Sequence, residues 1–270
     1  MKALVKGSVA TLVALASTAS LAANVALYSS FYTASVIPDT PHTTTAVTLA
    51  DIESGALATY DVLVVGHLDT NDFSAQACTQ LESFISSGGG VVTDWNAVGI
   101  LFDNYGPNIY VGVQPQCGLF NGTVDFGDVV GTGTLINILD TSHPTMSGLP
   151  NPFSMGDGSE FFYTVSGFDA GTWSVIAEYD GNGGTWPAVM TSSALGGMVV
   201  VGTMDYFDVL PASDADAVLL INNMIEFAST GSGGIEPQAI PSLPSYGLAL
   251  LAILIGLIGW RTQRFGRPTQ

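Results

Sequence analysis

The chain has 270 residues, with 5 Lys and Arg against 23 Asp and Glu, and 47% of its residues are hydrophobic. All basic residues lie in the first six or the last ten positions, and all 23 acids lie between Asp39 and Glu236. The body of the chain therefore has a formal charge of −23, and its three His are the only side chains there that can become cations. Because Lys and Arg neutralise phosphates in nucleic-acid complexes, this composition excludes nucleic acid as a partner. The hydrophobic content is typical of a globular domain and excludes a disordered chain.

Residues 1–22 have the organisation of a secretory signal peptide. Lys2 and Lys6 precede an apolar run over residues 9–16, and the segment ends in Ser20-Leu21-Ala22, with small residues where a signal peptidase reads. We expect cleavage after Ala22 or Ala23. Residues 23–229 then form one α/β domain, since their number falls within the single-domain range.

The composition changes abruptly after this domain. Residues 230–244 are rich in Gly, Ser and Pro, which predicts a linker, and residues 245–261 are apolar enough to predict a transmembrane helix. The apolar run over 246–260 rises about 22 Å as a helix, short of a hydrocarbon core of roughly 30 Å, so flanking residues must complete the span. Residues 262–270 form a basic tail, and no Lys or Arg lies between Lys6 and Arg261. This asymmetry predicts a cytoplasmic tail and a domain outside the cytoplasm.

The start of this C-terminal segment resembles a known sorting signal. Residues 240–247 read Ile-Pro-Ser-Leu-Pro-Ser-Tyr-Gly, followed by the apolar helix and the basic tail. This pattern is similar to the IPTL-type signal of exported Gram-negative bacterial proteins, a relative of the PEP-type signals handled by exosortase-like membrane proteases, with Ser and Tyr in place of the usual Thr and Trp. The resemblance implies export, contact with the inner membrane, an exosortase-like sorting protease as partner, and anchoring, release or display at the cell surface. The matching positions are Ile240, Pro241, Ser242, Leu243, Tyr246 and Gly247.

Strand-like and helix-like runs alternate within the domain. Ala77, Leu81 and Phe84 recur at helical spacing, with Ser74 as an N-cap candidate and glycines from Gly88 as the stop, so we expect a helix over 74–86. Apolar runs on both sides of this helix predict a parallel βαβ unit. The expected strands are 24–29, 43–49, 61–66, 90–94, 135–139, 173–179, 186–191 and 198–203, and a closing helix is expected over 214–228.

Several of these runs resemble a second family. Residues 60–65 leading to 81–92, together with 143–150 and 196–202, are similar to the class I glutamine-amidotransferase-like, flavodoxin-type fold, in particular its ThuA-like (trehalose-utilisation) branch. The resemblance implies a doubly wound, mostly parallel sheet, to which the turn at 180–184 adds a β-hairpin region.

The same resemblance argues against the family's chemistry. An active amidotransferase has a Gly-x-Cys-x-Gly turn after the strand that ends here near residue 93, whereas this chain has Thr-Asp-Trp-Asn-Ala over 93–97. The late strand ends in Thr203-Met204-Asp205, without the family's His-x-Glu pair. We therefore carry over no catalytic residue and expect no amidotransferase activity.

Cys78 and Cys117 are the only cysteines of the chain. In an exported protein an even number of cysteines favours a disulfide over a nucleophile or a metal ligand. A catalytic pair with His67 or His143 is the alternative, but the cationic surroundings that activate a thiol are absent from this sequence.

Polar residues follow the predicted strands at their carboxyl ends, where open α/β sheets usually bind ligands. One hypothesis is that these side chains converge on a divalent cation, the single cofactor that the sequence suggests. The other is that they are solvated loop acids in a chain full of acids. The candidate metal ligands are His67, Asp69, Asp94 and Asp205.

Three classes of function remain open. The first is an exported envelope or surface protein whose domain serves binding or structure without catalysis. The second is a metal-assisted hydrolase acting on carbohydrate or another extracellular polymer, and the third is a calcium-dependent adhesion or matrix module. The missing nucleophile, the acidity and the sorting signal favour the first class, and nothing in the sequence names the ligand.

Overall fold

A computed structural model of the protein describes residues 22–37, 41–130, 134–154, 160–181, 183–209 and 214–231. The predicted signal peptide, sorting motif, transmembrane helix and basic tail lie outside these residues, except for Ala22 at the edge of the domain. None of the helices in the described ranges combines the length and the apolar character that crossing a membrane requires.

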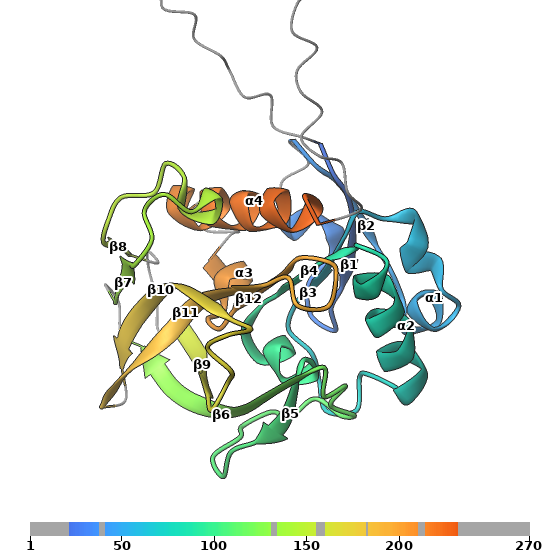
Figure 1. The fold of residues 1–270 in the computed structure, drawn as a ribbon, viewed down its shortest axis with the longest axis horizontal. Coiled ribbons are helices and arrows are strands. Elements are labelled where there is room, and N and C mark those ends of the chain that lie inside the picture. Colours follow the sequence, from blue (N-terminus) through green and yellow to red (C-terminus); the bar gives the residue numbers. More distant parts are fainter. Residues whose placement is uncertain are drawn as a thin grey trace, which may run out of the picture. The chain divides into compact units, whose positions relative to one another are not determined.

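A large sheet forms the centre of the domain (Figure 1). Its strands are β1 (Asn24–Tyr28), β2 (Thr43–Ala46), β3 (Val62–Val65), β4 (Gly90–Thr93), β7 (Leu135–Ile138), β8 (Phe153–Ser154), β10 (Ser174–Gly181), β11 (Gly184–Ser192) and β12 (Val199–Gly202). Within the described residues their order is β2-β1-β3-β4-β12-β11-β10-β7-β8. The first five strands in this order are parallel, and every later neighbour is antiparallel.

The sheet is therefore mixed, which corrects the prediction of a mostly parallel sheet with an added hairpin. The hairpin of β10 and β11 is present, but β11 pairs with β12 along the edge of the parallel part and so extends the main sheet. A tight turn between consecutive strands forces antiparallel pairing, because a parallel neighbour needs a long crossover. The hairpin turn thus accounts for the antiparallel pairing of β10 with β11.

A second, smaller sheet was not predicted. It consists of β5 (Phe102–Tyr105), β6 (Phe120–Val130) and β9 (Glu160–Ser166), in the order β5-β6-β9. Its longest strand is interrupted by glycines and acids, so the sequence there lacks a clean alternation of apolar and polar residues.

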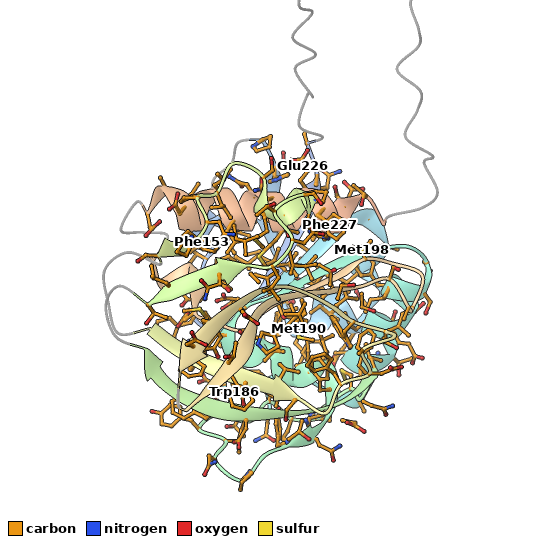
Figure 2. All side chains as sticks on the ribbon, turned by 60° about the vertical axis from the view of Figure 1, so that its left-hand side comes forward. Phe153, Trp186, Met190, Met198, Glu226 and Phe227 are labelled. Carbon is orange, nitrogen blue, oxygen red and sulfur yellow. A yellow bond between two sulfur atoms is a disulfide. The ribbon has the colours of Figure 1, made fainter. Side chains whose placement is uncertain are left out.

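Helices cover both faces of the large sheet (Figure 1). Side chains of α1 and α2 pack with one set of strand residues, and those of α4 pack with the alternate set, as the two-residue repeat of a strand requires. Figure 2 shows side chains filling both layers, with Phe227 on α4 and Met190 in the middle of the fold. The helices are α1 (Leu49–Glu53), α2 (Ala75–Ser86), α3 (Tyr206–Val209) and α4 (Ala215–Ser229), and the 3-10 helices are η1 (Ala34–Val36), η2 (Ala56–Thr59), η3 (Trp95–Ile100) and η4 (Pro144–Met146).

Local sequence explains the two long helices. The Ser74 hydroxyl accepts a hydrogen bond from the Ala77 N–H at 3.0 Å, which satisfies one of the free donors at the start of α2. Asp214 caps α4 in the same way. At Gly90 a Cβ atom would overlap with the carbonyl oxygen of Ala228, so glycine is what allows α4 to lie directly on β4.

Cys78 and Cys117 form a disulfide that joins α2 to the segment between β5 and β6. Their Cα atoms lie 5.1 Å apart, and 39 positions separate them in the chain. The bond therefore fastens the second sheet to the helix layer of the first.

We expect the double substitution Cys78→Ser, Cys117→Ser to lower the free energy of unfolding by about 3 to 4 kcal/mol, because a cross-link over this span restricts the unfolded chain. Denaturant unfolding measures the loss. Reductant should destabilise the wild-type protein by a similar amount and leave the double variant unchanged. Two free thiols in protein taken from the envelope, detected by mass analysis without reductant, would contradict the bond.

Candidate functional site

The carboxyl ends of β1, β3, β4 and β12 meet at one edge of the large sheet. From β1 the chain moves to β2 on one side, and it then returns to β3 on the other side. Such a reversal of strand order separates the loops that follow the two strands, and it marks the usual ligand site of an open α/β sheet. The loops after β1 and β3 are therefore where a ligand site is expected.

Neutral hydrogen bonds hold these loops together. The Ser29 hydroxyl after β1 donates to the carbonyl oxygen of His67 after β3 at 2.9 Å, and it accepts from the Tyr32 N–H at 3.0 Å. The Asn96 amide after β4 accepts from the Leu68 N–H at 3.0 Å and donates to the Leu68 carbonyl at 2.5 Å. His67 is thus fixed between two neighbouring loops.

An aromatic cluster covers this edge of the sheet, made of Phe31, Tyr32, His67, Trp95 and Phe207. The Phe31 ring lies flat on the His67 imidazole, with centroids 4.8 Å apart and an interplanar angle of 11°. The Trp95 ring lies 4.0 Å from the same imidazole. Phe31 is 70% exposed and Trp95 only 3%, so the aromatic cluster runs from the surface into the core.

The backbone at Trp95 has an unusual conformation. Trp95 has a φ of 48°, in the left-handed region that bulky residues rarely adopt, and it forms the turn from β4 into η3. Its N–H donates to the Met204 carbonyl at 3.1 Å, which ties this turn to the end of β12. A conformation of this kind costs on the order of 1 to 3 kcal/mol and is concentrated at functional sites in proteins.

Two buried carboxyl groups lie beneath the aromatic cluster. Asp94 is fully buried and Asp205 is 6% exposed. Asp94 Oδ1 accepts from the Tyr206 N–H at 2.8 Å, and a side-chain hydrogen bond joins Asp94 to Asp205. Asp205 Oδ1 accepts from the Tyr32 hydroxyl at 2.8 Å. Burial raises the pKa of Asp94 well above its usual value, and the neighbouring Asp205 raises it further. The pair therefore retains a proton at pH values where exposed carboxyls are ionised.

The structure brings two of the four predicted metal ligands together. Asp94 and Asp205 are neighbours, whereas the His67 ring packs against aromatic rings and Asp69 lies on an exposed loop. In the part of the chain that the structure describes, no three His, Cys, Asp or Glu side chains gather closely enough to hold a metal ion. Of the four candidates, the structure thus joins Asp94 and Asp205 as a carboxyl pair, and a metal site at this end of the sheet stays a prediction from the sequence.

The sequence interpretation missed the aromatic cluster. Its signal was present, since an aromatic residue lies within five positions after the end of each of three strands: Phe31 after β1, Trp95 after β4 and Phe207 after β12. Only the order of the strands shows that these positions are adjacent.

Comparison with known protein families identifies a sorting signal near the C-terminus. Residues 238–265 match the IPTL-CTERM motif. This motif implies an exported protein that sorting machinery at the membrane processes. The search of curated proteins found no match.

The fold of the domain is similar to that of solved structures. A Bacteroides uniformis protein that carries the description ThuA-like aligns with a TM-score of 0.56 and 15% identity, over 75% of this chain and 90% of that one. A cytoplasmic protein from Salmonella typhimurium LT2 aligns with a TM-score of 0.52 and 13% identity, over 76% of this chain and 99% of that one. The domain is therefore a mixed α/β fold resembling ThuA-like proteins, and at this identity the likeness concerns the fold alone.

We expect Asp94→Asn to stabilise the protein at neutral and alkaline pH. The pKa of Asp94 is raised in the folded state, so its stabilising contribution is complete below about pH 4 and is lost as the pH rises toward the folded-state pKa. Asparagine does not ionise and removes this loss. A gain on the order of 1 kcal/mol would raise the melting temperature by about 2 to 4 °C.

Thermal unfolding at pH 4, 6 and 8 measures the difference between variant and wild type. The matched control is Glu82→Gln, which removes one charge from an exposed position on α2. The advantage of Asp94→Asn should widen with pH, beyond that of the control. A difference that stays constant across the three pH values would contradict a proton held by this pair.

Proposed function

We propose that the protein is exported and sorted at the cell envelope, where its domain binds a ligand and performs no amidotransferase chemistry. The observation that carries this proposal is the IPTL-CTERM motif over residues 238–265. The motif indicates where the chain is sent. The strained turn at Trp95, between β4 and η3, bears on what the domain does there.

The rest of the sequence supports the destination. Residues 1–22 have the features of a signal peptide, and residues 245–261 those of a transmembrane helix followed by a basic tail over 262–270. This arrangement supports a domain that lies outside the cytoplasm. An exosortase-like protease of the inner membrane is the partner that would process the segment from Ile240 to Gly247, leaving the domain anchored, displayed or released.

The turn after β4 supports the absence of amidotransferase chemistry. In a nucleophile elbow, the catalytic residue lies on a strained turn between a strand and a helix. Here the residue with the strained backbone is Trp95, whose indole has no nucleophilic atom suited to acyl transfer. Both cysteines are engaged in a disulfide. In place of a nucleophile, the site has aromatic rings above a pair of carboxyl groups. This arrangement suits the binding of a ligand.

The other two classes of function lack a comparable observation. A metal-assisted hydrolase and a calcium-dependent adhesion module both need several ligands around one cation. The described residues bring only Asp94 and Asp205 together at this edge of the sheet, and no contact among those residues favours either class.

Cell fractionation tests the destination. We expect the domain in the envelope of wild-type cells, accessible to added protease. Pro241→Ala, inside the motif, should leave the chain unprocessed in the inner membrane, whereas Pro237→Ala, a linker proline just before residues 238–265, should behave as wild type. Full-length, uncleaved protein in the cytosol would contradict export, and equal processing of both variants would contradict sorting through this motif.

A glutaminase assay tests the chemistry. We expect the purified protein to release no ammonia from glutamine above a blank, because the elbow carries Trp95 and no thiol is free. An active amidotransferase in the same assay serves as the positive control. Activity that disappears in Cys78→Ser would overturn the non-catalytic proposal.

A further inference from the structure

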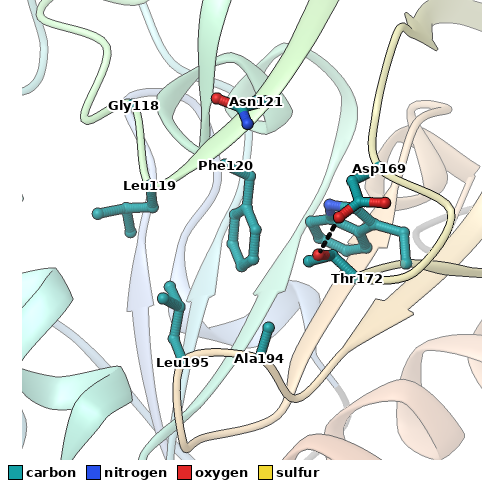
Figure 3. Close-up of a pocket in the computed structure, with 9 residues that line it drawn as sticks. Gly118, Leu119, Phe120, Asn121, Asp169, Thr172, Ala194 and Leu195 are labelled. Atoms are coloured by element: carbon teal, nitrogen blue, oxygen red, sulfur yellow. Dashed lines mark hydrogen bonds between the residues drawn. The ribbon is translucent and has the colours of Figure 1, made fainter.

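Two features lie at the amino ends of the parallel strands, at the opposite end of the sheet from the aromatic cluster. The first is a cavity of about 230 Å³ between the start of β6, the turn before β10 and the turn before β12 (Figure 3). Its aromatic residues Phe120 and Trp173 are 6% and 4% exposed, so packing in the core already covers their rings, and Asp169 is its carboxyl group. The second feature is the start of the domain, where the chain enters β1.

The fold fixes Ala23, the residue before β1, on all of its polar atoms. Ala23 is 3% exposed, and its side chain belongs to the core layer that α4 covers. Its carbonyl oxygen accepts a hydrogen bond from the Thr43 N–H at 3.0 Å. Its own N–H donates to Nδ1 of His42 at 3.3 Å. Since Asn24 of β1 lies opposite Thr43 of β2, Ala23 and His42 are the preceding pair in the same parallel register.

His42 presents a lone pair to this N–H. The side chain is 1% exposed, and burial lowers the pKa of its imidazole, while the backbone of Asn222 and the charge of Glu226, both on α4, oppose this shift in part. The ring is therefore neutral at pH 7. An amide N–H can only donate, so Nδ1 is the acceptor and the ring proton lies on Nε2. The domain thus places a neutral acceptor at the nitrogen of its first buried residue.

Ala22 differs from Ala23, because it is exposed and precedes the sheet. Hydrolysis after Ala22 leaves every contact of Ala23 in place, whereas hydrolysis after Ala23 would remove a buried residue together with both of its hydrogen bonds. The positions that a signal peptidase reads agree with the fold. Cleavage after Ala22 uses the small residues Ser20 and Ala22, while cleavage after Ala23 would put the large Leu21 at the first of these positions.

We propose that a signal peptidase hydrolyses the bond between Ala22 and Ala23, and that Nδ1 of His42 then holds the new α-ammonium group of Ala23. The oxygen of one water bonds to the Ala22 carbonyl carbon, which leaves as a carboxylate, and both water protons end on the Ala23 nitrogen. An α-amino group with an ordinary pKa of about 7.7 to 8.0 is mostly protonated at pH 7. The inference rests on the proposed export, and it adds the site that receives the mature N-terminus.

The surroundings of this nitrogen favour a cation. The hydrogen bond to His42 becomes charge-assisted, which makes it roughly twice as strong as the neutral bond. The next N–H in the chain, that of Asn24, donates to the Asp61 carboxylate at 2.8 Å, and the charge of Glu226 acts on the His42 ring from α4. No Lys or Arg side chain lies in the domain to compete for these groups. Removal of the signal peptide therefore supplies a cation that the domain otherwise lacks.

The N-terminus of the mature chain tests the bond that is cleaved. Protein purified from the envelope should begin with Ala23-Asn24-Val25 in N-terminal sequencing. A mature chain that begins at Asn24 or later would overturn the inference and leave export intact. An uncleaved chain in the cytosol would contradict export itself, so the two failures can be told apart.

The reactivity of the amine tests the role of His42. The mature chain has a single primary amine, since Lys2 and Lys6 are lost with the signal peptide and the sequence has no other Lys. Acetylation by an N-hydroxysuccinimide ester, followed by intact-mass spectrometry, therefore reports on Ala23 alone. We expect the native protein at pH 7 to react about tenfold more slowly than a peptide of residues 23–28, as for a pKa raised by about one unit. Equal rates would overturn the inference.

Two variants make this assay specific. His42→Phe keeps an aromatic ring but removes the acceptor, and it should bring the rate close to that of the peptide. His143→Phe is its matched control, because Nδ1 of His143 also accepts a backbone N–H at 3.3 Å, from Thr145, and it should react as wild type does. A glycine inserted between Ala22 and Ala23 leaves the core unchanged and moves the amine one residue outward, so this variant should also react at the rate of the peptide.

A pair of carboxyl variants tests whether the amine is held as a cation. Glu226→Gln removes a negative charge beside His42 and should raise the rate about twofold. Asp169→Asn removes the same charge at the cavity beside β12, three strand spacings or roughly 14 Å from β1 and beyond a screening length of about 8 Å, so the rate should not change. An equal response to both substitutions would contradict a cation held at His42. A wild-type rate in both His42→Phe and the glycine insertion would do the same.

Discussion

The absence of Lys and Arg from the domain is the constraint on which the rest of the structure depends. No carboxylate between residues 23 and 229 can find a basic partner other than histidine, so each acid must be solvated, hydrogen-bonded or protonated. Exposed carboxylates are stabilised by hydrogen bonds that they accept from hydroxyl and N–H groups within tight turns and helix caps. Thr48 bonds Asp51, Ser142 bonds Asp140, and Gly171 bonds Asp169, and in each case these bonds lower the pKa of the carboxyl. The fold thus stabilises its negative charges locally, without long-range ion pairs inside the domain.

The same constraint shapes the carboxyl ends of the parallel strands. A buried carboxylate there has no Lys or Arg to offset it, and Asp94 and Asp205 are held by N–H and hydroxyl donors together with a retained proton. Serine and asparagine side chains fasten the loops, and aromatic rings cover the carboxyl pair. This end of the sheet combines a strained Trp95 and a buried carboxyl pair, each of which destabilises the fold. Such costs collected at one place indicate that the site is retained for a function other than stability.

A sorting signal and a domain with binding surfaces fit together physically. A strongly acidic domain repels others of its kind and stays soluble outside the cell, and it attracts cationic groups. The cavity that Asp169 lines carries the same sign of charge on a small scale. The disulfide between Cys78 and Cys117 fixes the second sheet, which supplies Phe120 to that cavity, onto the helix layer.

The sequence by itself determined local elements and the sorting motif, because a short-range pattern carries that information. Apolar runs marked β1, β3, β4 and β12, helical spacing with Ser74 as cap marked α2, and residues 240–247 marked the sorting motif. Tertiary structure alone decided the antiparallel half of the large sheet, the second sheet of β5, β6 and β9, and which side chains meet. Asp94 and Asp205 are neighbours because β4 pairs with β12, more than a hundred positions apart in the chain, and no local periodicity encodes such a pairing.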